Sequence, residues 1–182
     1  DSHRRATGNV GLSLAVALAV SPDDRHVYVG GAVDYAIAMF SRDLGTGALS
    51  YLGAFELADA GLTCTLRTCE EMQGMDVSPD GSFVYVTVQY GSILVLARDA
   101  LTGLLSPAHL LAYGSELFSV KVSPDGMSVY TTDASASRVS AFARTLGTGA
   151  ITLLETELLS QALKAAISDD GANVYAINNG SL

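Results

Sequence analysis

Side chains that could do acid–base chemistry are few in this chain of 182 residues. Carboxylates such as Glu70, Glu71 and Glu116 could transfer protons, but nothing in the sequence ranks one above another. The three histidines are His3 in the N-terminal tail, His26 in a repeated turn and His109 in an outer strand. A Ser-His-Asp arrangement cannot be assembled from these positions. The sequence therefore presents no recognisable catalytic constellation.

Two cysteines, Cys64 and Cys69, lie close together in a non-repeating segment. A zinc site would need further cysteine or histidine ligands nearby, and the segment has none. The spacing also differs from the Cys-x-x-Cys redox motif. A local disulfide is therefore expected, which would place the protein in an extracellular or periplasmic compartment. The alternative is a pair of free thiols in the cytosol.

A wider set of polar side chains lies on expected loops, where rigid scaffolds commonly carry their functional residues. If the protein binds a small molecule or a protein partner, these loops are the predicted place. Ordinary solvated loop residues are the alternative interpretation. The candidates are Asp34, Tyr35, Glu70, Glu71, Gln73, Tyr90, Glu116, Asp133 and Arg138.

An internal repeat dictates the elements that must position these loops. Ser-Pro-Asp or a close variant begins at Ser21, Ser78, Ser123 and Ser168, at intervals of 57, 45 and 45 residues. A Val-Tyr pair begins six residues after each of these serines, and Thr-Gly follows in the first three units. Pro, Asp and Gly make tight turns, and the β-branched and aromatic residues between them favour short strands.

Four short strands in about 45 residues, repeated, are the size of one blade of a β-propeller. The predicted fold class is therefore all-β: a propeller of four-stranded antiparallel blades, about three and a half of which are present. The inner strands should be covered on both faces by neighbouring blades. The predicted divisions are a tail at 1–11, blade 1 at 12–57, an insertion at 58–71, blade 2 at 72–114, blade 3 at 115–159 and half of blade 4 at 160–182.

Two sets of repeated residues are given structural roles. The turn aspartates could be read as metal ligands, but they are a whole blade apart and each has local amides to cap. The tyrosines of the Val-Tyr pairs are expected to pack between blades. No metal and no cofactor are therefore predicted. The residues are Asp23, Asp80, Asp125 and Asp170, with Tyr28, Tyr85, Tyr130 and Tyr175.

The composition excludes several partners. The chain has 10 Lys and Arg against 19 Asp and Glu, a formal net charge of -9, which disfavours nucleic acid. Lys121 and Lys164 are its only lysines, so it has no basic patch for a membrane surface. The apolar segment 10–20 imitates a signal peptide, but its repeat register favours a strand. Membrane insertion is not expected.

The repeated segments resemble the lactonase-like propeller family with YVTN-type repeats. The resemblance rests on Val77-Ser78-Pro79-Asp80-Gly81 with Val84-Tyr85-Val86, on its counterparts in the other units, and on the Asp-x-x-Thr-Gly-x-Leu turns at 43–49 and 99–105. It covers almost everything from Leu12 onward. Members include enzymes that open sugar lactones and muconate lactones, together with exported propellers of no established chemistry. None of the family's catalytic residues can be matched here.

Two functions from different classes follow from these observations. The favoured one is an exported propeller module for binding or assembly, supported by the cysteine pair, the acidic surface and the missing catalytic constellation. The alternative is a lactone hydrolase acting on a small cyclic ester, supported by the resemblance. Closed propellers need 4–8 blades. The expected partners of these blades are therefore further blades, from a longer chain of about seven blades or from another copy.

Overall fold

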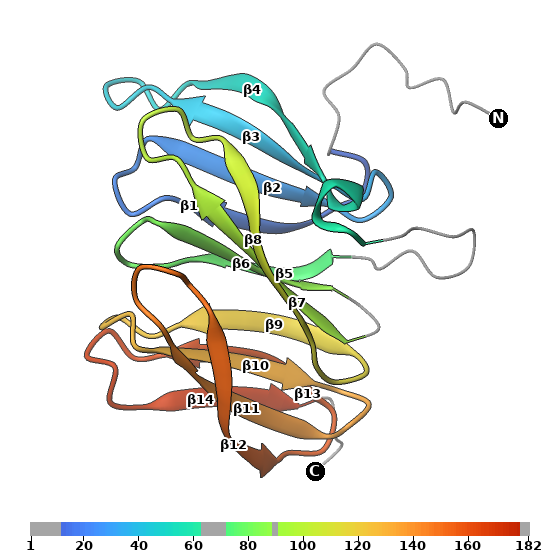
Figure 1. Cartoon of the computed structure of the whole chain (residues 1–182). Helices are drawn as coiled ribbons and strands as arrows, with labels where there is room; N and C mark the ends of the chain where they lie inside the picture. The colour runs from blue at the N-terminus through green and yellow to red at the C-terminus, as the bar shows by residue number, and fades with distance from the viewer. Residues whose placement is uncertain (1–11, 63–71, 89–90, 179–182) are drawn as a thin grey trace, which may run out of the picture.

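The computed structural model describes residues 12–62, 72–88 and 91–178, and this part of the chain folds into strands grouped as successive blades (Figure 1). Three four-stranded antiparallel sheets are followed by a two-stranded sheet. Each sheet pairs strands in chain order, as a simple meander. This is the predicted all-β architecture of a partial propeller, which confirms the fold class. In this part of the chain no helix is both long and apolar enough to cross a membrane.

Each blade contributes one strand to each radial position. Blade 1 consists of β1 (Ala15–Val20), β2 (His26–Gly31), β3 (Ala36–Arg42) and β4 (Leu49–Glu56). Blade 2 consists of β5 (Met72–Val77), β6 (Phe83–Val88), β7 (Ser92–Arg98) and β8 (Leu105–Ala112). Blade 3 consists of β9 (Leu117–Val122), β10 (Ser128–Asp133), β11 (Arg138–Arg144) and β12 (Ile151–Leu158). The last sheet holds β13 (Ala162–Ile167) and β14 (Val174–Asn178).

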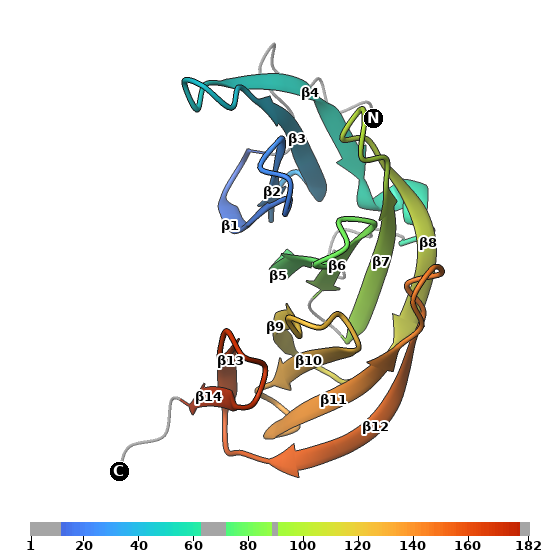
Figure 2. The same ribbon diagram turned by 90° about the vertical axis from the view of Figure 1, so that its left-hand side faces the viewer.

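The blades form an open arc with one strand of each along its inner side (Figure 2). The inner strands β1, β5, β9 and β13 contact one another in that order. The outer strands β4, β8 and β12 lie on the opposite, convex side. The arrangement places the Ser-Pro-Asp and Thr-Gly turns at one end of the blades and the connections between second and third strands at the other.

One strand boundary differs from expectation in the same way in all three complete blades, and a second differs in blade 1 alone. The third strands run on to Arg42, Arg98 and Arg144, which the sequence pattern assigned to the following turns. Leu57 leaves the fourth strand and begins the short 3-10 turn η1 (Leu57–Ala60). An arginine beside Asp-x-x-Thr-Gly reads as a polar turn residue, so its place in the sheet was not foreseen.

The core is the set of interfaces between blades. One buried cluster joins Tyr28, Ile37 and Met39 of blade 1 to Leu94 and Leu96 of blade 2. A second joins Tyr85, Ile93 and Val95 of blade 2 to Phe142 of blade 3. A blade therefore buries its apolar face only against a neighbour, as in other repeat architectures.

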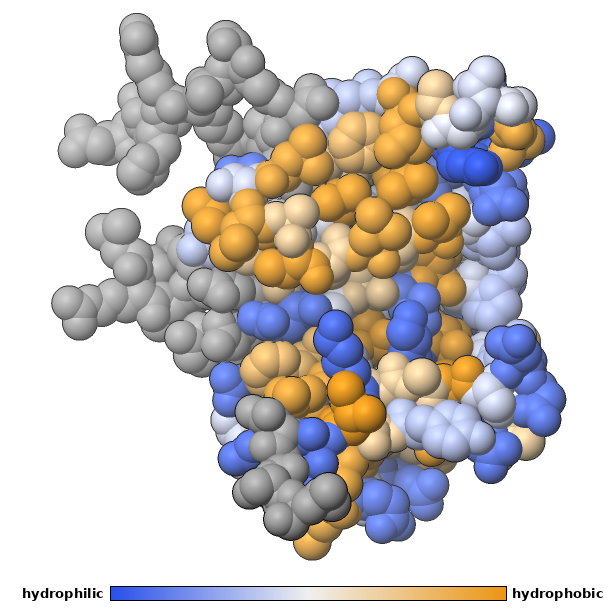
Figure 3. All heavy atoms as spheres, turned by 180° about the vertical axis from the view of Figure 1, so that it is seen from behind, coloured by the Kyte–Doolittle hydropathy of each residue, from blue (hydrophilic) through white to orange (hydrophobic). Residues whose placement is uncertain are grey.

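The expectation that every inner strand is covered on both faces is wrong for β1. Leu14, just before β1, and Leu18, within it, are each 62% exposed, because no sheet in the described residues precedes blade 1. The space-filling view of the inner side shows an apolar area in its upper half (Figure 3). Blade 1 thus ends the arc with an open apolar surface.

Candidate functional site

The repeated Ser-Pro-Asp turns are closed by their own side chains. In blade 2, Ser78 Oγ donates to Asp80 Oδ1 over 2.6 Å, and Asp80 Oδ1 accepts the Ser82 amide over 3.0 Å. The same pair of contacts recurs at Asp23, Asp125 and Asp170. The predicted capping role of these aspartates is confirmed. Within the described residues no group of three or more His, Cys, Asp or Glu is arranged to hold a metal ion.

A second set of contacts links each turn to the next blade. Arg144 of blade 3 pairs with Asp80 Oδ2 of blade 2 at 2.7 Å and donates through Nε to the Tyr85 hydroxyl at 2.8 Å. Its Nη1 donates to the carbonyl of Gly126 in its own blade at 3.0 Å. The Tyr85 hydroxyl in turn donates to the carbonyl of Gly149 at 2.8 Å. We call this arrangement the inter-blade clamp.

The same clamp joins blade 1 to blade 2. Arg98 pairs with Asp23 at 2.8 Å and donates to the Tyr28 hydroxyl at 2.9 Å and to the Gly81 carbonyl at 3.0 Å. Both arginine side chains are almost fully buried, at 1% and 0% exposure. Burial by itself raises the pKa of Asp23 and of Asp80, but the serine hydroxyls and the clamping arginines lower both pKa values below the ordinary 3.8. Both aspartates are therefore ionised in the folded protein.

The clamp is incomplete at both ends of the arc. Arg42 keeps the contact within its own blade, to the Asp24 carbonyl at 3.3 Å, but no preceding blade faces it in the described structure. Tyr28 and Tyr85 are fully buried, which confirms their predicted packing role. Tyr130 is only half-buried and Tyr175 is 60% exposed, because the described part of the chain contains no following third strand to cover them.

The sequence pattern places His26 in a repeated turn, but in the structure His26 belongs to a strand. It is the first residue of β2, is 4% exposed, and its Nδ1 lies 2.7 Å from Arg98 Nη2. Since arginine is always protonated, this nitrogen accepts and the imidazole is neutral. Burial first, and then the charge of Arg98, lower the pKa of His26 below its ordinary 6.5.

The lowered pKa of His26 predicts a loss of stability in mild acid. The folded state binds fewer protons than the unfolded state below pH 6.5. The stability that neutral His26 contributes is therefore present above pH 6.5 and is lost as the pH falls from there through the folded pKa. Urea unfolding at pH 7.5 and 5.5 measures this loss. The variant His26→Phe, which copies Phe83 of blade 2, should lose less unfolding free energy between these two pH values. An equal loss in both proteins would contradict the role given to neutral His26.

At the other end of blade 3, three of the predicted loop residues come together. Asp133 is 1% exposed and accepts backbone hydrogen bonds from Ser115 and Ala136, each at 2.9 Å. Arg138 lies 3.4 Å from Asp133, and Glu116 accepts a hydrogen bond from the Ser135 hydroxyl. Burial raises the pKa of Asp133, but the backbone donors prevail and lower it. This cluster holds the loops between the strands, so Asp133 serves as a turn anchor.

The remaining loop candidates lie apart from this cluster. Asp34 accepts the Ser13 amide at 3.0 Å beside Tyr35 in blade 1, and Gln73 lies on the inner strand β5. The predicted set is thus spread over three places. Candidates that fall outside the described residues are Glu70, Glu71, Tyr90, Cys64 and Cys69.

A groove with a mostly apolar lining lies along the inner side of the arc, where one strand from each blade meets. It has a volume of about 180 Å³ and is lined by β1, β5, β9 and β13. Its polar lining includes Gln73, Lys121 and Lys164. Polar side chains cross the middle of this side in Figure 3. The two lysines of the chain, which no sequence motif marks, therefore lie on adjacent inner strands.

Lys121 is paired with the neighbouring inner strand. Its ammonium lies 3.6 Å from Asp76 Oδ1, and Asp76 Oδ2 accepts the Val122 amide at 2.9 Å. Burial raises the pKa of Asp76 above 3.8, although Lys121 and the Val122 amide act in the opposite direction. We call this groove the inner groove; it is lined by the two ammonium groups of Lys121 and Lys164, and the Asp76 carboxylate lies beside it through its pairing with Lys121. This set can accept a proton and stabilise negative charge.

The comparison with protein families decides the identity of the fold. Residues 17–168 match the model of the family described as lactonase, 7-bladed beta-propeller. This chain belongs to that lactonase family. The match includes all strands of blades 2 and 3, both complete clamps and most of the inner groove. A search of curated proteins finds no match.

Solved structures share the fold at low sequence identity. A putative 6-phosphogluconolactonase from Bacteroides uniformis aligns with a TM-score of 0.71 and 16% identity, over 88% of this chain and 42% of its own. The periplasmic gluconolactonase of Pseudomonas aeruginosa gives 0.67 and 18%, over 88% and 41%. A Lactobacillus plantarum protein gives 0.69 and 24%, over 79% and 42%. The chain thus spans less than half the length of each of these propellers.

Proposed function

We propose that this chain supplies blades to a propeller that hydrolyses a small cyclic ester, and that the inner groove contributes to the reaction. The observation that carries this proposal is the lactonase family match over residues 17–168. The descriptions of two structural neighbours as a putative 6-phosphogluconolactonase and a gluconolactonase support a sugar lactone as the substrate class. An exported binding module, which the sequence favoured, has no comparable support.

The inner groove and the Asp76 carboxylate beside it together have the groups that lactone opening needs. In this reaction water adds to the ester carbonyl carbon, a negative charge forms on the carbonyl oxygen, and the ring C–O bond then breaks. Asp76 would take the proton from the attacking water, because burial raises its pKa towards the working pH. Lys121 and Lys164 would stabilise the oxyanion or an anionic substituent of the sugar. The proton finally passes to the leaving alkoxide, giving a hydroxy acid.

Hydrolysis of a panel of sugar lactones, followed by acid release, tests the proposal. Asp76→Asn removes the base and Lys121→Ala removes a positive charge, so each should lower kcat/KM by about 100-fold or more. Asp169→Asn makes the same change at an exposed residue outside the groove lining; this matched control should hydrolyse lactones at the unaltered rate. A folded protein with no lactone turnover, or undiminished turnover in Asp76→Asn, would overturn the proposal.

We also propose that the protein works in an oxidising compartment, on the strength of the Cys64 and Cys69 pair. The four residues between these cysteines allow a local disulfide, which such compartments preserve. Peptide mapping of the unreduced protein should recover one cross-linked peptide, about 2 Da lighter than its reduced form. Two freely alkylated thiols in protein taken from its native compartment would contradict the expectation.

A further inference from the structure

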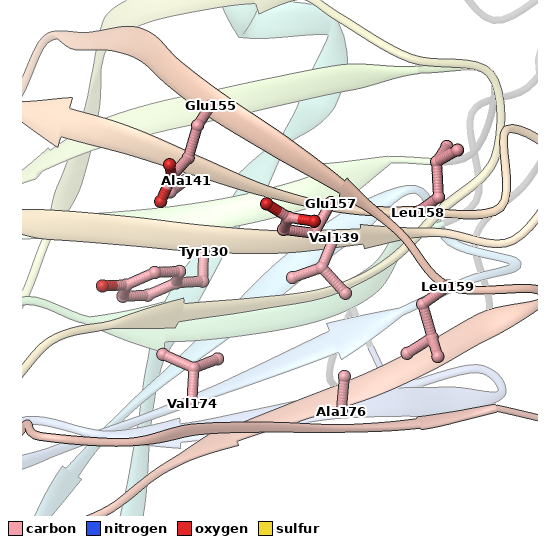
Figure 4. Close-up of a pocket in the computed structure, with 9 residues that line it drawn as sticks. All are labelled: Tyr130, Val139, Ala141, Glu155, Glu157, Leu158, Leu159, Val174 and Ala176. Atoms are coloured by element: carbon pink, nitrogen blue, oxygen red, sulfur yellow. The ribbon is translucent and has the colours of Figure 1, made fainter.

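A second groove lies between blade 3 and the last strand of the arc. It has a volume of about 410 Å³, more than twice that of the inner groove. Tyr130 and Val139 of blade 3 face Val174 and Ala176 of β14 across it (Figure 4). We call it the blade-4 groove. The full lining is Tyr130, Val139, Ala141, Glu155, Glu157, Leu158, Leu159, Val174 and Ala176.

The repeat identifies what fills the same place between the earlier blades. By register, Tyr130 pairs with Ala141 as Tyr28 pairs with Met39 and Tyr85 pairs with Val95. The tyrosine faces of blades 1 and 2 are buried against the third strand of the next blade, by Leu94 and Leu96 in one case and by Phe142 in the other. The corresponding face of blade 3 borders the open groove instead.

The third strand that fills each earlier position also brings the clamping arginine. Arg98 follows Leu96 by two residues, and Arg144 follows Phe142 by two, so an apolar side chain and the arginine share one face of the strand. Their acceptors in blade 3 would be Asp125 and Tyr130. Asp125 caps its turn as Asp80 does, and no arginine is bonded to it in the described structure.

The groove also has the charge that would select such a strand. Glu155 and Glu157 line its outer part, opposite Ala141 and Val139 of β11. They carry negative charge into the groove, and Asp125 adds a further carboxylate in the turn that leads to the strand of Tyr130. The edge of β14 that faces away from β13 has no strand paired with it in the described residues, and a free edge can accept an added strand.

We propose that the blade-4 groove is the seat of an arginine-bearing β-strand, the third strand of blade 4, which pairs with the edge of β14. Its arginine binds the Asp125 carboxylate and the Tyr130 hydroxyl. Its apolar residue two positions earlier packs on Tyr130 and Ala141. The partner of this surface is thus a β-hairpin of the same repeat, with the pattern apolar-x-Arg at the end of its first strand.

The chain's own blade 3 hairpin provides the probe. A labelled peptide of residues 138–158 is titrated into the full 182-residue chain, and binding is followed by fluorescence anisotropy. Hydrogen exchange then locates the bound peptide. Saturable one-to-one binding is expected, with new protection of the amides of β14. The Arg144→Ala peptide should bind at least tenfold more weakly. The protein variant Asp125→Asn retains an oxygen to cap its turn. It should lower the affinity for the unaltered peptide and leave the affinity for the Arg144→Ala peptide unchanged.

A fusion covers the case in which the free hairpin does not fold. Residues 138–158 are repeated directly after Leu182, where the 45-residue spacing of Tyr130 and Tyr175 sets the register of a third strand. The fused chain should melt at least about 5 °C higher, and changing the copied arginine to alanine should remove most of that gain.

Three results would overturn the proposal. The first is equal binding, or an equal gain in Tm, with and without the arginine. The second is binding without protection of β14. The third is a dimer, seen by sedimentation velocity, in which a second copy of the chain protects β14 and excludes the peptide. Failure of both the peptide and the fusion counts against it as well. None of these readouts depends on lactone hydrolysis.

Discussion

Replacing Arg144 with alanine is expected to lower the free energy of unfolding by about 3 kcal/mol. The guanidinium is fully buried and makes hydrogen bonds to Asp80, Tyr85 and Gly126. Its removal leaves the buried Tyr85 hydroxyl without its charged donor and the Asp80 carboxylate without its counter-charge. Asp80 remains 39% exposed, so water compensates part of the loss. Urea unfolding at pH 7.5 measures the change.

The chain contains its own control for this experiment. Arg42 occupies the same position in blade 1, but among the described residues its guanidinium donates to the Asp24 carbonyl of its own blade, at 3.3 Å. Arg42 is half-buried but makes no contact between blades in the described structure, so Arg42→Ala should cost less than about 0.5 kcal/mol. Arg98→Ala should cost at least as much as Arg144→Ala, because three of its partners correspond and it also bonds His26. If Arg42→Ala and Arg144→Ala were equally destabilising, the clamp between blades would not be the source of the effect.

Gly103→Ala is expected to be as damaging, for a steric reason. Gly103 has a φ of +75°, and a β-carbon placed there would lie 2.1 Å from Cδ2 of His26 in the preceding blade. The left-handed backbone alone costs an alanine about 1 kcal/mol. The overlap with a buried ring adds about 1–3 kcal/mol, because His26 is held by Arg98 and cannot move freely. Gly149, which meets Phe83 at 2.5 Å, should behave alike.

Gly47 separates the two contributions. It also has a φ of +75°, but the nearest atom to an added β-carbon is Arg42 Nη2 at 3.9 Å. Gly47→Ala should show the backbone cost alone, about 1 kcal/mol. The difference between Gly103→Ala and Gly47→Ala in thermal or urea unfolding then measures the fit between blades. Equal losses of stability in the two variants would mean that the close contact between Gly103 and His26 adds nothing to the cost.

The sequence predicted the blades well because local chemistry forms them. Ser78 and Asp80 close their turn without any other blade, so the turn signal is complete within a few residues. The clamp was missed because it depends on two residues far apart, Asp80 and Arg144, and an arginine next to a turn motif looks like a solvated side chain. The exposure of β1 was also missed, since the pattern of a strand does not reveal whether a neighbour covers it.

The candidate site was predicted only in part, for a related reason. Glu116, Asp133 and Arg138 were assigned to loops and do meet at one end of blade 3, although Asp133 anchors the turn there. Gln73 lies in the inner groove. Lys121, which also lines that groove, and its ion-pair partner Asp76 belong to strands of apolar appearance. The sequence cannot show which alternate residues of an inner strand turn toward the axis.

The order of the clamp residues along the chain affects how the protein folds during synthesis. Arg98 follows Asp23 by 75 residues, and Arg144 follows Asp80 by 64, so each aspartate acceptor is synthesised well before its arginine donor. During synthesis the tyrosine face of a blade has no arginine bound to it until the third strand of the next blade has left the ribosome. The newest blade is therefore always the one with its apolar face open. Folding advances from the N-terminus, and aggregation during synthesis should begin at the growing end.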